Sequence, residues 1–231
     1  MIFISSYLNR GVKNENIIRI YVAPDFLNHV SDKKFLEGFR KKFTDPSNKI
    51  ILFVGRLVEW KGVEYLIRSL LEIRDAQVHL IVTSSGILLE KLQNLAKSLD
   101  LENKVTFFGG ATREEVGWLH DISDIFVCPS IIDSEGATEQ MPLVIPEAME
   151  SRLPVIATSV AGIGDVVKHE VNGLLVDQKN PTAIAKAIER IISDKELEKR
   201  IIENSQETVK EFSPETIARK HLEIYQSLIK K

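Results

Sequence analysis

Short apolar runs alternate along the chain with longer stretches in which apolar residues recur every three or four positions. Apolar runs without polar alternation are typical of strands covered on both faces, and helical stretches between them are typical of crossover connections. The strands are expected at Lys49–Val54, Val78–Val82, Val105–Phe108, Ile125–Val127, Val155–Ala157 and Leu174–Val176. The pattern predicts an α/β fold, a Rossmann-like parallel sheet with helices on both faces.

The helical stretches between these strands begin at recognisable residues. Thr112 and Glu115 have the spacing of a capping box. Asn180-Pro181 and Ser213-Pro214 each combine a capping side chain with a first-turn proline. Ser85-Gly86 precedes a stripe of leucines at helical spacing, so a helix is expected there too.

The first 48 residues show a weaker pattern. Ile17–Val22 could form a strand and Phe35–Phe43 a short helix, but polar segments and proline-interrupted turns separate them. We interpret residues 1–48 as a connecting segment with modest structure of its own.

Composition excludes several classes of function. The 231 residues carry 30 basic and 33 acidic side chains, with no long run of either sign, which argues against a nucleic-acid partner. The single cysteine, Cys128, excludes an internal disulfide and suits a reducing compartment. No apolar run approaches the roughly 18 residues of a transmembrane span. We expect a cytoplasmic protein, either free or peripheral at the inner face of the membrane.

Two cations flank the turn after the first predicted strand. Arg56 follows that strand directly, and Lys61 stands five residues later at the start of a helix. A strand-to-helix turn directs backbone N–H groups and the positive end of a helix at one point, which suits a phosphate group. The two side chains could therefore clamp a diphosphate. The alternative is that both are solvated surface charges.

Two glutamates lie around the start of another predicted helix. Seven residues separate Glu139 from Glu147, and Pro146 is a plausible first-turn residue. Both carboxylates would then face the carboxyl edge of the sheet, where open α/β folds bind ligands. An acidic residue at a helix start also has a purely structural explanation for Glu147. Glu139, in an apolar loop, is harder to explain in that way.

Other candidates carry weaker signals. The turn Gly162-Ile163-Gly164-Asp165 lacks the further glycine and the acidic residue of a dinucleotide fingerprint. We interpret Cys128 as an inert buried thiol and His79 as a hydrogen-bonded residue of the sheet. Trp60 is expected to pack in the core or to border the pocket at Lys61.

These residues together resemble a known family. The segments ILFVGRLVEWKGVEYLI, VHLIVTSSGILLEKL, KVTFFGGATREEV, DIFVCPS, TEQMPLVIPEAMESRLPVIATSVAGIGDVV and VNGLLV are similar, in order and spacing, to the donor-binding half of family 4 glycosyltransferases. The resemblance implies the C-terminal domain of a retaining enzyme of the GT-B fold. The pattern from Asp133 to Met149 is most similar to members that build surface polysaccharides.

The resemblance also implies roles for individual residues. Arg56 and Lys61 would hold the donor diphosphate, Glu139 would contact the transferred sugar as the catalytic residue, and Glu147 would hold the ribose hydroxyls. Backbone groups of Leu143 and Val144 would lie against ribose and phosphate, and those of Gly110 and Ala111 would edge the base. The donor would be a nucleoside-diphosphate sugar, such as a UDP- or GDP-sugar. No cofactor is implied, and since the chain lacks an Asp-x-Asp pair, we expect no metal.

The chain departs from the family pattern at four positions. Gln140, Thr83, Arg152 and Ala161 stand where glycine is usual. Side chains at these positions could narrow the pocket, since glycine allows close backbone approach.

The preceding acceptor-binding domain of full-length relatives has no counterpart in the chain. Residues 49–231 would form the nucleotide-sugar-binding domain with a C-terminal crossover helix, whose apolar face would favour association.

Three functions are consistent with these features. The first is a donor domain that transfers sugar to a glycan or lipid-linked acceptor. The second is a non-catalytic nucleotide-sugar-binding subunit that needs a separate acceptor-domain partner. The third, a nucleotide-sugar epimerase, ranks lower because the resemblance to that group does not extend to the paired glutamates.

Overall fold

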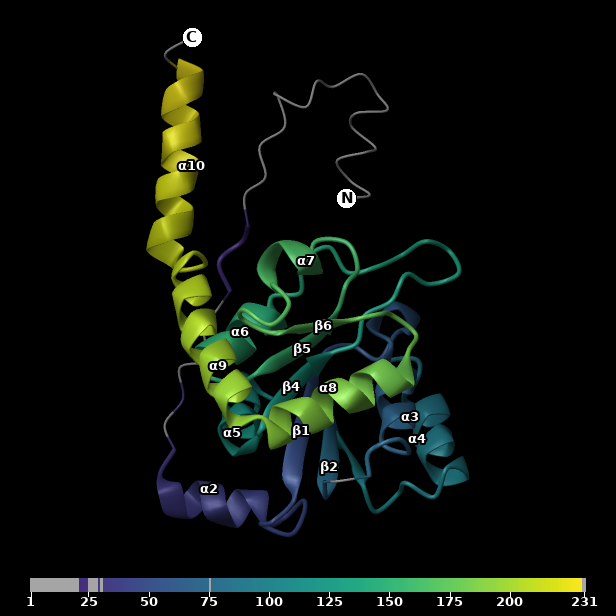
Figure 1. Ribbon diagram of the computed structural model, residues 1–231. Coiled ribbons are helices and arrows are strands. Elements are labelled where there is room, and N and C mark those ends of the chain that lie inside the picture. The colour runs from purple at the N-terminus through teal and green to yellow at the C-terminus, as the bar shows by residue number, and fades with distance from the viewer. Residues whose placement is uncertain (1–20, 25–28, 30, 75, 230–231) are drawn as a thin grey trace.

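A parallel sheet forms the centre of the protein. The computed structural model describes residues 21–24, 29, 31–74 and 76–229 (Figure 1). Its strands are β1 (Lys49–Val54), β2 (Val78–Thr83), β3 (Val105–Gly109), β4 (Ile125–Cys128), β5 (Val155–Thr158) and β6 (Leu174–Val176). They lie in the order β3-β2-β1-β4-β5-β6, and every neighbouring pair is parallel. The predicted α/β architecture is confirmed.

Four strands are slightly longer than the apolar pattern predicts. Strands β2 to β5 each extend one residue further toward the carboxyl edge. The added residues are polar or small, and they pair with a neighbouring strand, as Thr83 does with Gly109 and Thr158 with Val176. Backbone pairing therefore continues past the last apolar side chain.

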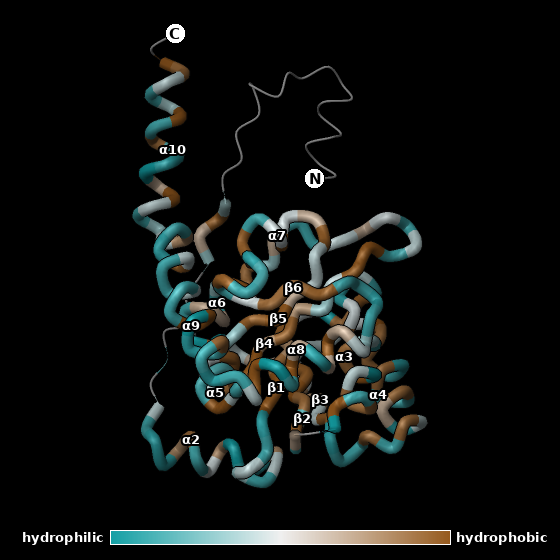
Figure 2. Tube along the Cα trace, viewed as in Figure 1, coloured by the Kyte–Doolittle hydropathy of each residue, from teal (hydrophilic) through white to brown (hydrophobic). Residues whose placement is uncertain are grey.

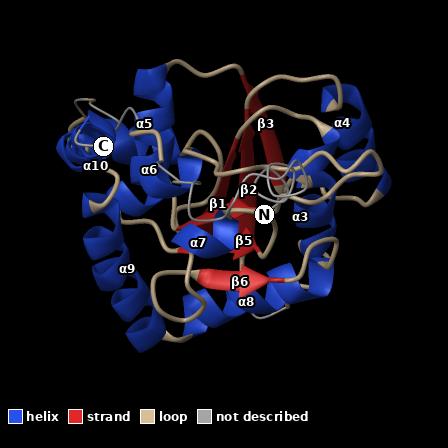
Figure 3. Ribbon diagram, turned by 90° about the horizontal axis from the view of Figure 1, so that it is seen from above, coloured by secondary structure: helices blue, strands red, loops and turns tan. Residues whose placement is uncertain are grey.

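Helices cover both faces of the sheet (Figure 3). One face holds α3 (Val63–Ser69), α4 (Leu89–Ser98) and α8 (Pro181–Ser193). The other face holds α2 (Lys33–Arg40), α5 (Arg113–Ile122), α6 (Val144–Glu150) and α7 (Ile163–Val166). Helix α9 (Lys195–Lys210) contacts both α8 and α6. The apolar strands thus lie between two layers, as their brown colour at the centre of Figure 2 shows.

Most helix starts follow the predicted caps. Thr112 and Glu115 form the capping box of α5, and Asn180 accepts a hydrogen bond from the backbone N–H of Ala183 at 3.0 Å. Helix α4 begins later than Ser85-Gly86 suggests. A Cβ atom placed on Gly86 would lie 2.5 Å from the carbonyl oxygen of Leu57. This glycine therefore packs against the loop after β1, and the helix starts after that contact.

Part of the first 48 residues belongs to the core. Helix α2 starts at Lys33, before the predicted Phe35, because the Asp32 side chain accepts a hydrogen bond from the Phe35 N–H. Phe39 is only 8% exposed. Its ring lies 5.9 Å from that of Trp118 on α5. Of the predicted strand Ile17–Val22, only Tyr21 and Val22 lie within the described residues, and they are not in a strand.

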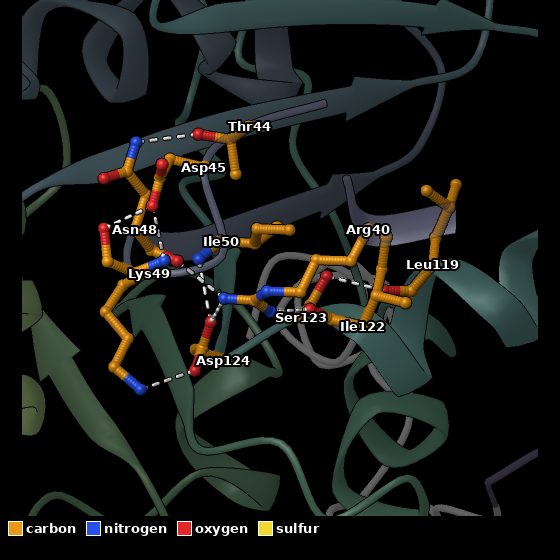
Figure 4. A network of polar contacts seen from close by, with 11 residues as sticks. Arg40, Thr44, Asp45, Asn48, Lys49, Ile50, Leu119, Ile122, Ser123 and Asp124 are labelled. Carbon is orange, nitrogen blue, oxygen red and sulfur yellow. Dashed lines mark hydrogen bonds and ion pairs between the residues drawn. The ribbon is translucent and has the colours of Figure 1, made fainter. Parts of the chain in front are cut away.

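A polar network fastens α2 to the amino edge of the sheet (Figure 4). The Asp124 carboxylate accepts hydrogen bonds from Arg40 Nη2 at 2.9 Å, from Lys49 Nζ at 2.7 Å and from the backbone N–H of Ile50 at 2.9 Å. Burial acts to raise the pKa of Asp124, but these three donors outweigh burial and hold the pKa below its usual value. The carboxylate therefore contributes stability as an anion.

Two of the residues that stand where glycine is usual in the family have a left-handed backbone conformation. Arg152 has φ 60° and Ala161 has φ 44°, both in the left-handed region. Arg152 follows α6, where the N–H of Leu153 bonds back to the carbonyl oxygen of Ala148 at 3.0 Å. This is the geometry of a helix end that usually employs glycine. The backbone keeps the glycine conformation although the side chain has changed.

The last helix extends away from the body of the protein. Helix α10 (Pro214–Ile229) projects upward in Figure 1, and only Ile217 on it is buried. Leu222, Tyr225 and Leu228 are each more than half exposed. Within the described residues, no helix combines the length and hydropathy needed to cross a lipid bilayer.

We predict that Asp124→Asn lowers the free energy of unfolding by about 2–3 kcal/mol at neutral pH, because Arg40 and Lys49 lose a partly buried anionic partner. The folded-state pKa is lowered, so the stabilisation is complete above a pH of about 4 and is lost as the pH falls through the folded pKa. Urea unfolding at several pH values measures both effects. The same change at exposed Asp100 should have little effect at any pH.

We also predict that Arg152→Gly raises the free energy of unfolding by about 1 kcal/mol, because glycine adopts the left-handed conformation without the Cβ penalty. Arg200→Gly, at an exposed position within α9, should instead lower it by about 1 kcal/mol. Thermal unfolding of the two variants compares them directly. Destabilisation in both would contradict the role given to Arg152.

Candidate functional site

The site lies where the strand order of the sheet reverses. Strands β1 and β4 are neighbours, but the chain leaves β1 toward α3 on one face and β4 toward α6 on the other. The two loops therefore diverge at the carboxyl edge and leave a crevice between them. The loop after β1 carries Arg56 and Lys61, and the loop after β4 carries Glu139.

Lys61 and Glu139 form an ion pair across this crevice. Lys61 ends a short 3-10 helix, Glu59–Lys61, and its side chain is only 10% exposed, against 19% for Glu139. A Cβ atom placed on Gly55 would lie 3.5 Å from Lys61 Nζ, so the ammonium group lies over the end of β1. Two groups predicted to act on one ligand are therefore in contact.

Arg56 belongs to the same cleft. Its guanidinium group lies 5.9 Å from the ring centroid of Trp60, at cation–π distance. A cleft of ≈ 460 Å³ opens beside them. The residues that line it are Arg56, Trp60, Gly136, Ala137, Thr138, Glu139, Gln140 and Met141. Trp60 thus borders the pocket, one of the two positions expected for it.

A glycine holds the Lys61 segment against the end of β4. Gly62 has φ 66°, and a Cβ atom on it would overlap the carbonyl oxygen of Pro129 and come within 3.1 Å of Ile131 Cγ2. The backbone N–H of Ile131 also donates to the carbonyl oxygen of Trp60 at 2.8 Å. The loops after β1 and β4 are therefore joined through their backbones beside the ion pair.

Glu147 lies in a second ionic contact, on α6. It is 6% exposed, and its Oε1 accepts a hydrogen bond from Arg113 Nη1 at 3.0 Å. Leu143 and Val144 begin α6, and the N–H of Glu147 bonds to the carbonyl oxygen of Leu143 at 3.2 Å. Pro146 lies in the first turn, as the sequence suggested.

Gly110 and Ala111 come directly before α5, the helix that carries Arg113. The contact between Arg113 and Glu147 thus brings the predicted base strip close to the predicted ribose residue. Of the predicted site residues, only Arg56 and Glu139 line the cleft; those that do not are Lys61, Gly110, Ala111, Leu143, Val144 and Glu147. The predicted site therefore occupies two adjoining patches.

Arg113 was not expected from the sequence. A positive side chain in the first turn of a helix opposes the helix dipole, so it has no local reason to be there. That mismatch is the one signal in the sequence that could have identified it. Its carboxylate partner lies 34 residues further along the chain.

Residues expected to be structural are found in structural settings. His79 Nε2 lies 2.8 Å from Thr106 Oγ1 on the neighbouring strand, and burial lowers the pKa of His79. Burial raises the pKa of the Cys128 thiol, which keeps it protonated and inert. In the described part of the chain, no group of three or more His, Cys, Asp and Glu side chains is placed to hold a metal ion.

Comparison with known proteins shows the family of the chain. The profile of the family described as Glycosyl transferases group 1 matches residues 35–208. The chain belongs to this family. An uncharacterized glycosyltransferase of Methanocaldococcus jannaschii is 36% identical over 191 residues, which are 81% of this chain and 47% of the relative. The GDP-mannose-dependent alpha-(1-6)-phosphatidylinositol monomannoside mannosyltransferase of Mycobacterium tuberculosis is 29% identical and covers 68% of this chain and 42% of the relative.

Solved structures extend the match to the whole fold. The Anabaena protein HepE in complex with UDP superimposes with a TM-score of 0.82 at 25% identity, covering 96% of this chain and 61% of that one. This group 1 glycosyltransferase chain thus has the C-terminal-type domain of the GT-B fold, as the resemblance implied. The chain spans about half the length of the curated relatives it matches.

We predict that Gly62→Ala lowers the free energy of unfolding by about 2 kcal/mol or more, because a side chain there meets the Pro129 carbonyl in a left-handed backbone. Gly38→Ala, at an exposed position of α2, provides the control, since nothing lies within 4 Å of its added Cβ atom. That variant should gain up to about 1 kcal/mol. Chemical denaturation would show the contrast, and equal stability of the two variants would contradict the docking of Lys61 described above.

Proposed function

We propose that this chain is the donor-binding domain of a retaining glycosyltransferase. It takes a nucleoside-diphosphate sugar and passes the sugar to a glycan or lipid-linked acceptor. The observation that carries the proposal is the ion pair between Lys61 and Glu139, whose carboxylate residue lines a cleft together with Arg56. A cation for phosphate and a carboxylate for sugar hydroxyls meet there at the ligand-binding edge of an α/β sheet.

The diphosphate would take the positive side of the cleft. Arg56 is exposed and offers a planar set of N–H donors that matches two phosphate oxygens. Lys61, held at the end of β1, would add a second charge. In this view Lys61 turns from Glu139 to the phosphate when the donor enters.

The two glutamates would address the two sugars of the donor. Glu139, released from Lys61, would accept hydrogen bonds from hydroxyls of the transferred sugar as the catalytic residue. Glu147, on the adjoining patch, would accept from the ribose hydroxyls, with Arg113 orienting its carboxylate. Backbone groups of Leu143, Val144, Gly110 and Ala111 would then edge ribose and base.

Ligands of related proteins support this class of donor. The solved HepE structures hold UDP, and one of them holds UDP-glucose. The mycobacterial relative is named as GDP-mannose-dependent. We therefore choose UDP, GDP and their sugars as the compounds to test on this chain.

The proposed reaction breaks the bond between the anomeric carbon and the oxygen of the β-phosphate. The electron pair leaves with the nucleoside diphosphate, and the acceptor hydroxyl forms the new bond and gives its proton to the departing oxygen of the β-phosphate. Arg56 and Lys61 would stabilise the charge that develops on the leaving group. Because these cations supply that charge, we propose that transfer requires no metal, which assay in the presence of a chelator would check.

The acceptor would bind outside the part described here. Relatives are about twice as long as the matched region, so we propose that an acceptor-binding domain or partner chain completes the cleft. The exposed residues Leu222, Tyr225 and Leu228 on α10 offer an apolar stripe for such a contact. The proposed role is in surface polysaccharide synthesis. We propose that the protein acts in the cytoplasm, either free or at the inner face of the membrane.

Calorimetric titration with UDP, GDP, UDP-glucose and GDP-mannose tests the donor site. We predict that Arg56→Ala and Lys61→Ala each weaken binding of the diphosphate by about 1–3 kcal/mol, the scale of a charge-assisted hydrogen bond. Arg68→Ala, which removes a half-exposed guanidinium on α3, should leave binding unchanged. Uridine lacks the diphosphate, so its affinity should not respond to either substitution.

The outcomes separate the competing functions. Failure of every nucleotide to bind at millimolar concentration would refute the donor site. Transfer or hydrolysis of the sugar by the purified chain alone would exclude a non-catalytic subunit. Altered stereochemistry of the free nucleotide sugar would indicate an epimerase.

A further inference from the structure

We infer that Gly162 is a positioning residue for the loop that carries Glu139. A Cβ atom placed on Gly162 would overlap the carbonyl oxygen of Gln140 and lie 3.3 Å from its carbonyl carbon. Gln140 follows Glu139 directly in the chain. The start of α7 therefore forms the surface against which the Glu139 loop rests, and this inference depends on the proposed function.

Steric contact, not backbone strain, explains why glycine is required here. Gly162 has φ −81° and ψ −1°, an ordinary helical conformation open to any residue. Gly164, two positions later in the same short helix, has nothing within 4 Å of an added Cβ atom. The two glycines differ in what they touch, so one turn of the chain contains both the test position and its control.

The contact between Gly162 and Gln140 lies in the second part of the β4–α6 loop, the part that carries Glu139. The first part of the β4–α6 loop is held from other elements, where Thr158 Oγ1 donates to the Ser130 carbonyl and Gln178 Oε1 accepts from the Ile132 N–H at 2.7 Å. In the same first part, Gly62 packs on Pro129, and the carbonyl oxygen of Trp60 accepts from the Ile131 N–H. Gln140 is where α7 supports the second part, next to the carboxylate.

The position of Glu139 affects binding of the transferred sugar more than binding of the diphosphate. Arg56 and Lys61 lie on the loop after β1, which Gly162 does not contact. A side chain at position 162 would displace Gln140 and Glu139, whereas the packing of Gly62 on Pro129 would still hold the backbone that carries Lys61. Loss of the Gly162 contact should therefore weaken recognition of the sugar and spare recognition of the diphosphate.

Titration of Gly162→Ala and Gly164→Ala with UDP and with UDP-glucose tests this separation. We expect Gly162→Ala to bind UDP-glucose about tenfold more weakly, the effect of misplacing a group by a fraction of its contact distance. Its affinity for UDP should stay within about twofold of the parent, and Gly164→Ala should match the parent for both ligands. Equal loss for UDP and UDP-glucose, or no loss at all, would overturn the inference.

Amide hydrogen exchange without ligand supplies a test that does not depend on the donor. Residues 138–141 should exchange about tenfold faster in Gly162→Ala than in Gly164→Ala, because the loop has lost its support. Equal exchange in the two variants would refute the positioning role even if the chain binds no nucleotide. Failure of the parent chain to bind any nucleotide would refute the proposed function alone.

If Gly162→Ala does not fold, amide hydrogen exchange of the unmodified chain tests the same inference. When UDP-glucose is added in place of UDP, residues 138–141 and 163–166 should gain protection together, because they form one packed unit. Protection of residues 138–141 without any change in 163–166 would show that the loop moves independently of α7, against the inference.

Discussion

The parallel arrangement of the strands is the constraint on which the rest of this structure depends. All strands of a parallel sheet end at the same edge, and each needs a long crossover over one face to reach the next. Because the order is β3-β2-β1-β4-β5-β6, the crossovers after β1 and β4 must go to opposite faces. Their loops part at that edge, and the ionic groups of the cleft lie on the parted loops.

Opposite charges allow these groups to be buried. Lys61 and Glu147 are both buried, and a lone charge so placed would lose several kcal/mol of hydration. Each is instead in contact with a group of the other sign, Glu139 for Lys61 and Arg113 for Glu147. The protein thus keeps charges ready at the crevice while the local sum of charge stays near zero.

Local signals in the sequence predicted most of the fold, and long-range contacts account for what was missed. Apolar runs located every strand, and the capping box at Thr112 located α5, because both depend on neighbouring residues. The delayed start of α4 depends on Gly86 meeting Leu57, and the partner of Glu147 lies on another helix. The first contact leaves no mark in a short stretch of sequence, and the second leaves only the unfavourable position of Arg113 in the first turn of α5. The grouping of Arg56, Lys61 and Glu139 was predicted because a parallel sheet brings those loops together.

The packing of α2 has a consequence for how such domains can be exchanged between proteins. Helix α2 precedes the first strand in the chain, yet Phe39 packs beside Trp118. Arg40 helps to neutralise Asp124 at the amino edge of the sheet. A recombination joint placed at Lys49 would remove the aromatic packing of Phe39 on Trp118. It would also leave Asp124 without Arg40. A joint ahead of Asp32 keeps α2, its N-cap and its ionic partner Asp124 together in the transferred segment.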